Sequence, residues 1–276
     1  MNKLTTDERR QVVSCLVEGN SLRATTRMTG IHRTTIMNLM VDLGEACAEY
    51  QDNAFRNLKC KRVQCDEIWS FVGAKDKNTT KEKRAGGWGD VWTWVAIDAE
   101  TKLVPCWHIG GRDAGAAWLF MNDLASRLTS RIQLTTDGHK AYISAVEDAF
   151  GCDIDYAMLI KLYGDSADGF PEKRYSPGEV TGMVRAVQSG RPDGKHVSTS
   201  FVERQNLTMR MSMKRFARLS NGFSKKLENH MAAVSLHYMH YNFCRVHQSL
   251  RVTPAMEAGV ADHVWSIEEV IALLKD

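Results

Sequence analysis

Three acidic residues occupy positions from which their side chains could bind divalent cations together. Asp66 lies in the alternating run from Val63 to Gly73, which is rich in residues suited to a pleated surface and predicts a central strand. Asp137 ends a second predicted strand and Glu203 lies on a predicted helix, so the three acids are 71 and 66 residues apart. Converging carboxylates of this kind hold two divalent cations about 3.5–4 Å apart, which clamp the attacking and leaving oxygens of a phosphoryl displacement.

Each acid also has a simpler interpretation when it is taken alone. Asp66 could be a solvated residue at a strand end, Asp137 could cap the following helix, and Glu203 could belong to a solvated charged stripe. Three acids in comparable settings favour the metal site, because an unpaired carboxylate on a buried strand is costly. All-oxygen ligation favours Mg²⁺, with Mn²⁺ as a substitute, and no histidine pair has the spacing of a zinc site.

The segments around these acids predict an α/β chain. Two strands joined by a short polar turn follow the Asp66 strand, and then a helix, a strand, a helix and a strand. This order predicts a ribonuclease H-like catalytic domain, which is a mixed sheet flanked by helices. Pro105 places the third strand at an edge or a bulge. The predicted segments are Val91–Ile97, Leu103–Ile109, Asp113–Ser130, Arg131–Thr136, Tyr142–Phe150 and Asp155–Leu162, and glycines and prolines predict a loop over 163–196.

Positive charge is concentrated in one part of the sequence. Residues 191–251 contain eleven lysines and arginines but only three acidic residues, so a polyanion could lie there. A helix predicted over 200–219 would place Arg210 and Lys214 on the same face as Glu203. These two cations are therefore candidate ligands of DNA phosphates.

The first sixty residues predict a small all-α helix-turn-helix domain. A helix over Asp7–Glu18, a short helix after Ser21, a turn at Gly30 and a third helix from about His32 match that motif. A small helical bundle used only for packing or dimerisation is the alternative. The third helix offers four residues able to hydrogen-bond phosphates or base edges, namely Arg33, Thr34, Thr35 and Asn38.

The whole chain has the composition of a soluble protein. Its 276 residues are 43% hydrophobic and 25% charged, with a net charge of +3. We expect a helix-turn-helix domain at 1–60, the catalytic domain at 61–260 and a C-terminal helix at 261–276, opened by a capping box of Ser266 and Glu269. Seven cysteines without a CxxC pair predict a reducing cytoplasm and no structural zinc. The absence of an apolar leader or a long apolar run predicts no membrane partner.

Five stretches of the sequence carry a family resemblance: CDEIWSFVG, TTDG, DYAMLIK, VSTSFVERQNLTMRMSMKRFARLSNGFSKK and YNFCRVHQSLRVTPAM. They resemble the transposases of the insertion sequence 1 family, which belong to the DDE class, over residues from about 63 to 259. The resemblance implies that Asp66, Asp137 and Glu203 are catalytic metal ligands. It also implies that Arg210 is the family's basic residue seven positions after the glutamate. The family prototypes carry a cysteine zinc finger before a helix-turn-helix, and this chain lacks its CxxC pairs.

These observations lead to the expectation of a transposase. It would bind the terminal inverted repeats of an insertion sequence, nick the element ends, and join the freed 3′-hydroxyls to target DNA in a reaction that depends on Mg²⁺. Because two ends must be handled together, we expect a homodimer or a larger homo-oligomer, acting in the cytoplasm at the bacterial nucleoid. The alternatives are a nuclease of the same fold without strand transfer and a domesticated DNA-binding regulator whose catalysis is vestigial.

Overall fold

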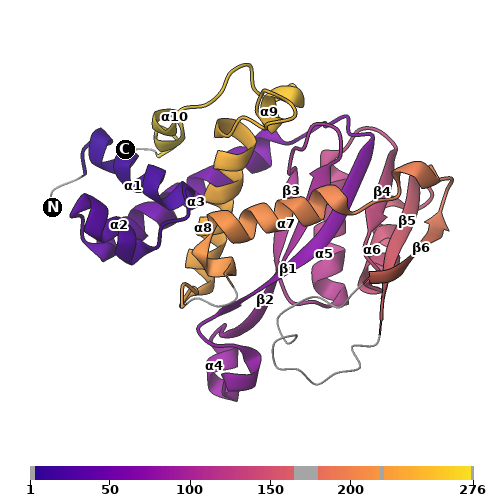
Figure 1. The fold of residues 1–276 in the computed structure, drawn as a ribbon, viewed down its shortest axis with the longest axis horizontal. Coiled ribbons are helices and arrows are strands. Elements are labelled where there is room, and N and C mark those ends of the chain that lie inside the picture. The colour runs from indigo at the N-terminus through magenta and orange to yellow at the C-terminus, as the bar shows by residue number, and fades with distance from the viewer. Residues whose placement is uncertain (1–3, 165–179, 218–220, 275–276) are drawn as a thin grey trace.

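A six-stranded mixed sheet forms the centre of the molecule (Figure 1). The computed structural model describes residues 4–164, 180–217 and 221–274. The strands are β1 Arg62–Val72, β2 Gly89–Asp98, β3 Cys106–Gly110, β4 Ile132–Thr136, β5 Ile154–Tyr163 and β6 Val180–Ser189. Across the sheet their order is β3-β2-β1-β4-β5-β6.

The pairing divides this sheet into an antiparallel half and a parallel half. β2 pairs antiparallel with both β1 and β3, whereas β4 pairs parallel with both β1 and β5. β6 then pairs antiparallel with β5. Hairpin-connected strands followed by parallel strands are the arrangement predicted for a ribonuclease H-like sheet, and the prediction of a mixed sheet flanked by helices is confirmed. β3 lies at an edge, as Pro105 predicts.

Helices cover both faces of the sheet. They are α1 Thr6–Val17, α2 Leu22–Thr29, α3 Arg33–Ala54, α4 Lys81–Ala85, α5 Ala114–Arg127, α6 Ala141–Phe150, α7 Ser200–Ser212, α8 Leu227–Met239, α9 Pro254–Glu257 and α10 Ile267–Ile271. α7 crosses one face in contact with β1, and α5 and α6 pack against each other on the other face (Figure 1). In the parts of the chain that the structure describes, no helix has the length and apolar content needed to span a bilayer.

The N-terminal helices pack into the rest of the molecule. Ser21 caps α2 through its side chain, and Gly30, with φ of 74°, ends that helix before α3 begins. The two helices therefore meet at a turn where the sequence predicts one, and a DNA-binding domain at 1–60 stays a prediction. α3 is a single helix of 22 residues that packs on α8, so closely that a Cβ on Gly44 would lie 2.3 Å from the carbonyl oxygen of Ala232.

Part of the segment predicted as a loop over 163–196 is a strand, so that prediction is wrong for β6. Among the strands that the structure describes, β6 pairs only with β5, and most of its side chains are exposed, including Met183 and Val187. A strand that buries neither face lacks the alternating pattern by which sequences reveal strands. Residues 165–179 of the same predicted loop lie outside the described residues.

α7 is shorter than the helix predicted over 200–219. It ends at Ser212, and Lys214–Phe216 forms a separate 3₁₀ turn. Met213 and Phe216 are buried in the core, so the chain turns inward after α7 instead of continuing along the surface. Lys214 is therefore not on the helix that carries Glu203, contrary to the prediction.

Candidate metal centre

Asp66 lies in the middle of β1, on the face that α7 covers. The strand predicted around it is present, and Asp66 is opposite Val95 of β2 in the sheet. Asn206 of α7 donates a hydrogen bond from Nδ2 to Asp66 Oδ2 at 2.9 Å. The carboxylate is therefore fixed by a neutral donor and not by a cation.

Asp137 follows β4 directly, and β4 is the parallel neighbour of β1. Cys65 pairs with Thr136, so Asp66 and Asp137 come at the same level of two adjacent strands. The backbone N–H of His139 donates to Asp137 Oδ1 at 3.0 Å, as the chain turns toward α6. Asp137 thus lies at the carboxyl edge of the parallel strands, where α/β folds place functional groups.

The sequence did not predict Glu67 as a site residue, yet its carboxylate lies close to those of Asp66 and Asp137. One carboxylate oxygen from each of the three acids lies within 4.8 Å of the others. On the face of the sheet opposite α7, Glu67 accepts hydrogen bonds from Arg112 Nε at 2.6 Å and from the Tyr142 hydroxyl at 3.1 Å. An Arg112 nitrogen also lies 3.9 Å from Asp137, so one guanidinium serves two acids.

Glu203 lies on α7 beside this acidic group. Lys161 Nζ of β5 is 2.5 Å from Glu203 Oε1, and the hydroxyl of Thr199 donates to the same oxygen. Its negative charge contributes to a raised pKa of Asp66, so the two carboxylates are near neighbours. Within the described residues, however, the acids whose oxygens lie within 4.8 Å of one another do not include Glu203. Of the three predicted ligands, Asp66 and Asp137 meet, and Glu203 lies next to them in an ion pair.

Gln64 fixes the start of α7 over the sheet. The side chain of Gln64 is buried, and its Oε1 accepts from the backbone N–H groups of Phe201 at 2.8 Å and Val202 at 3.2 Å. Thr199 occupies the N-cap position, but its side chain makes no cap hydrogen bond. A strand residue therefore caps the helix that carries Glu203.

The electrostatics of the acidic group suit a cation. Burial raises the pKa of Asp66 to about 7, and the negative charges of Asp137 and Glu67 act in the same direction. Burial also raises the pKa of Glu67, with Asp137 adding to the shift and Arg112 opposing it. Negative charge is thus held at an energetic cost that a positive ion would remove.

The donor atoms around Asp66 also fit a hard divalent ion. Three carboxylates supply only oxygen, and the buried Oδ1 of Asn206 has no hydrogen-bond partner among the described residues. Mg²⁺ and Mn²⁺ prefer carboxylate, amide and water oxygens. Asp66, Glu67 and Asp137 are therefore the residues that could hold such an ion, with Glu203 in reach.

The predicted DNA-binding residues are separate from the acids. Arg33, Thr34, Thr35 and Asn38 are exposed on the first turns of α3, at the end of the molecule formed by α1 and α2 (Figure 1). Arg210 of α7 donates from Nη1 to the carbonyl oxygen of Phe216 at 3.3 Å, and Lys214 is exposed in the 3₁₀ turn that follows. Arg33, Thr34, Thr35, Asn38 and Lys214 are therefore on the surface, whereas Arg210 is part-buried.

Glu67, Asn206, Arg112 and Lys161 are residues of the site that were not recognised from the sequence. Two had a local signal, because Glu67 adjoins Asp66 and Asn206 lies one helical turn after Glu203. Arg112 and Lys161 had none, since each meets its partner from a distant part of the chain. A sequence pattern could therefore have indicated only those site residues that lie close in sequence to a predicted acid.

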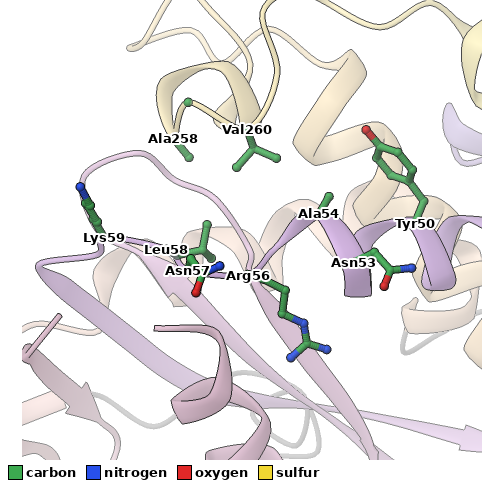
Figure 2. Close-up of a pocket in the computed structure, with 10 residues that line it drawn as sticks. Tyr50, Asn53, Ala54, Arg56, Asn57, Leu58, Lys59, Ala258 and Val260 are labelled. Carbon is green, nitrogen blue, oxygen red and sulfur yellow. The ribbon is translucent and has the colours of Figure 1, made fainter. Parts of the chain in front are cut away.

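A separate pocket lies away from the acids. It has a volume of about 670 Å³ and lies between the end of α3 and the segment after α9 (Figure 2). Its lining includes Tyr50, Arg56, Lys59 and Val260 but none of the four acids. Asp137 and Glu203 instead keep about a third of their side-chain surface exposed, at 33% and 40%, so a large substrate can reach them.

Comparison with known proteins gives only distant similarities. No family model matches the sequence, and no curated protein gives a significant match. A piggyBac transposase in a synaptic complex with hairpin DNA is similar over 99% of this chain and 71% of its own, with a TM-score of 0.44 and 11% identity. A Mos1 transposase in a paired-end complex with its left transposon end covers 54% of this chain and 58% of its own, at a TM-score of 0.22 and 12% identity. Endonuclease V from Bacillus subtilis is similar over 69% of this chain and 89% of its own, with a TM-score of 0.24 and 16% identity.

Proposed function

We propose that this protein is a DDE transposase of the insertion sequence 1 family. One observation carries the proposal: Asp66 and Asp137 meet at the carboxyl edge of a ribonuclease H-like sheet, and α7 places Glu203 beside them. Carboxylates gathered in this way on a surface open to a large substrate suit cleavage and transfer of a phosphodiester.

The acids and their neighbours have distinct roles in this proposal. Asp66, Asp137 and Glu203 would hold Mg²⁺, with Mn²⁺ as a substitute, and we expect two ions. When bound, such ions activate a water or a 3′-hydroxyl and stabilise the departing oxygen. Asn206 orients the carboxylate of Asp66, and Lys161 positions that of Glu203.

DNA recognition is assigned to the exposed residues. Arg33, Thr34, Thr35 and Asn38 would contact the terminal inverted repeats through a helix-turn-helix, because their side chains face solvent on the first turns of α3. Arg210 and Lys214 would contact phosphates near the cut. Joining two element ends to target DNA requires two active sites, so a homodimer or larger homo-oligomer is part of the proposal, acting at the bacterial nucleoid.

The test uses purified protein and a labelled duplex that carries the ends flanking its gene. We expect nicking and strand transfer that depend on Mg²⁺ in the wild type and their loss in Glu203→Gln, which keeps the size of the side chain and removes its charge. Glu147→Gln is the matched control, because Glu147 is exposed on α6. It should react as the wild type does.

The outcomes separate the alternatives. Cleavage without joined products would replace the transposase by a nuclease of the same fold. DNA binding without cleavage in the wild type would favour a regulator. Equal activity in the wild type and Glu203→Gln would refute the role of the third acid.

A further inference from the structure

The connection between β1 and β2 is a folded, basic projection. Residues 73–88, here called the hairpin lobe, contain a 3₁₀ turn, Asp76–Asn78, and the helix α4. Figure 1 shows the lobe at the tip of the β1–β2 ribbon, beyond the rest of the sheet. The lobe contains five cations, Lys75, Lys77, Lys81, Lys83 and Arg84, and only two acids, Asp76 and Glu82.

Three of these cations, Lys77, Lys81 and Lys83, are exposed and have no acidic partner within ion-pair distance in the part of the chain that the structure describes. The Lys83 ammonium also lies over the Trp88 ring, 5.1 Å from its centroid, and its side chain stays exposed to solvent. Arg84 instead pairs with Asp76 at 3.7 Å. Lys75 lies over two aromatic rings of β1, so its ammonium is partly occupied.

The lobe is anchored to the body of the molecule. The N–H of Gly73 donates to the carbonyl oxygen of Ser224 at 2.8 Å, and the rings of Phe71 and Phe223 lie 4.9 Å apart. Gly73 has φ of 71°, and a Cβ there would lie 2.2 Å from the ring of Trp88. The lobe therefore has a fixed base, and its lysines are presented from a defined place.

The lobe lies on the same edge of the sheet as the metal centre. β1 runs parallel to β4, and it continues for six residues beyond Asp66 to Val72. At about 3.3 Å per residue this places the base of the lobe about 20 Å from the acids. B-DNA rises 3.4 Å per base pair, so that distance corresponds to about six base pairs.

Further cations lie on the segment from the turn after α7 to the anchor of the lobe. A Cβ on Gly222 would lie 2.8 Å from Lys214, so the turn after α7 contacts the segment that leads to Ser224. Lys225 and Lys226 follow at once and are exposed. Positive side chains therefore occur from the turn after α7 to the anchor of the lobe, and a polyanion such as a DNA backbone could lie along them.

We propose that Lys77, Lys81 and Lys83 of the hairpin lobe bind the phosphate backbone of the duplex, about six or more base pairs from the phosphate that is cut. This assignment rests on the proposed function for the place of the cut, although phosphate binding by the lobe can be measured without cleavage. The contact is independent of sequence, because lysines that meet phosphates position a duplex without reading its bases.

The first experiment measures affinity against salt. The triple variant Lys77→Gln, Lys81→Gln, Lys83→Gln is compared with the wild type on a 30-base-pair duplex in EDTA, from low to high salt. Each lost phosphate contact lowers the slope of log K against log salt by about 0.9, so we expect a decrease of about 2.7. At 0.1 M salt this corresponds to a loss of about 500-fold in affinity.

A matched control removes three positive charges from the opposite edge of the sheet, where β1 begins. Lys59 and Lys61 precede β1, and Lys195 lies in the 3₁₀ turn Gly194–His196 near them; all three are exposed. Changing all three to glutamine should leave the slope of log K against log salt within about 1 of the wild-type value. Equal losses in both triple variants, or an unchanged slope in the lobe variant, would overturn the assignment.

Cleavage then separates this inference from the proposed function. On a duplex that ends four base pairs from the cut, the lobe variant should nick as the wild type does, and on a long duplex it should be slower. If the wild type cleaves nothing but the slopes differ, the proposed function fails and the lobe assignment stands. If the wild type cleaves and both duplex lengths give equal rates for the lobe variant, the lobe assignment fails.

Discussion

Replacing a proposed catalytic acid should make the metal-free protein more stable. Asp66→Asn removes a carboxylate whose pKa is raised to about 7 by burial and by the charges of Asp137 and Glu67. The substituted amide keeps the size of the side chain and an oxygen that can still accept from Asn206. The expected gain in stability is therefore electrostatic and not a matter of packing.

The sign of the effect follows from proton binding. In the unfolded chain Asp66 has its ordinary pKa of 3.8. Between pH 3.8 and about 7 the folded protein holds a proton that the unfolded chain has lost, so stability from this site falls as pH rises. Above pH 7 the folded protein carries the full free-energy cost of ionising the buried Asp66 carboxylate. At 1.36 kcal/mol per pH unit it amounts to about 4 kcal/mol, and contact with water reduces it to about 2 kcal/mol.

The assay is thermal unfolding in EDTA at pH 5 and pH 8. A gain of about 2 kcal/mol corresponds to a rise of about 4–8 °C in Tm, because 1 kcal/mol shifts Tm by about 2–4 °C in a domain of this size. We expect the advantage of Asp66→Asn at pH 8 and a smaller one at pH 5. Saturating Mn²⁺ should stabilise the wild type and not the variant.

The control is Asp148→Asn, an exposed aspartate of α6 whose change should leave Tm unaltered. An Asp66→Asn protein that is no more stable than the wild type at pH 8 in EDTA would refute the reasoning. So would an advantage that is larger at pH 5 than at pH 8, because that reverses the sign of the linkage.

Three further changes test the supports of the site. Gln64→Leu removes the acceptor of two N–H groups of α7, the part-buried one of Phe201 and the buried one of Val202, and urea unfolding should show a loss of about 1–3 kcal/mol; no loss would mean that water replaces the cap. Asn206→Ala removes the donor to Asp66 and should weaken Mn²⁺ binding about 10- to 100-fold by calorimetry, whereas unchanged affinity would exclude an orienting role. Burial lowers the pKa of His230 to about 3, so its unfolded form binds more protons below pH 6.5. Stability should therefore fall with acid by about 1.4 kcal/mol per pH unit from this site, and His230→Gln should show a shallower pH dependence.

The sequence predicts those features of the fold that depend on contacts between residues a few positions apart. Asp113 caps α5, and Ser266 with Glu269 forms the predicted capping box, because each of these interactions spans three residues. The residues suited to a pleated surface around Asp66 likewise predict β1, because most of that strand is buried. Local chemistry and burial therefore revealed the elements that carry Asp66 and Asp137.

The sequence does not predict contacts between distant residues. Lys161 meets Glu203 across 42 positions, and Gln64 meets Phe201 across 137. Neither a lysine near the end of a strand nor a glutamine inside a strand has a local sequence feature that indicates its distant partner. β6 escaped prediction for a different reason, because its exposed side chains give no burial pattern to read.

The charges of the site show why its acids are not equivalent. Arg112 pairs with Glu67 at 2.6 Å and Lys161 with Glu203 at 2.5 Å, so two of the four acids have a close cation. Asp66 accepts from the amide of Asn206 and from the backbone N–H of Glu67, with no cation within ion-pair distance among the described residues, and Asp137 has Arg112 no nearer than 3.9 Å. About two negative charges, those of Asp66 and Asp137, thus remain without a close cation. These two acids lie at the same level of the adjacent strands β1 and β4. A single divalent cation between Asp66 and Asp137 would balance them, and we infer that this position is filled first. Lys161 and Thr199 both bind Oε1 of Glu203, so Glu203 would reach a second ion through its other carboxylate oxygen, Oε2, while Lys161 holds the side chain in place.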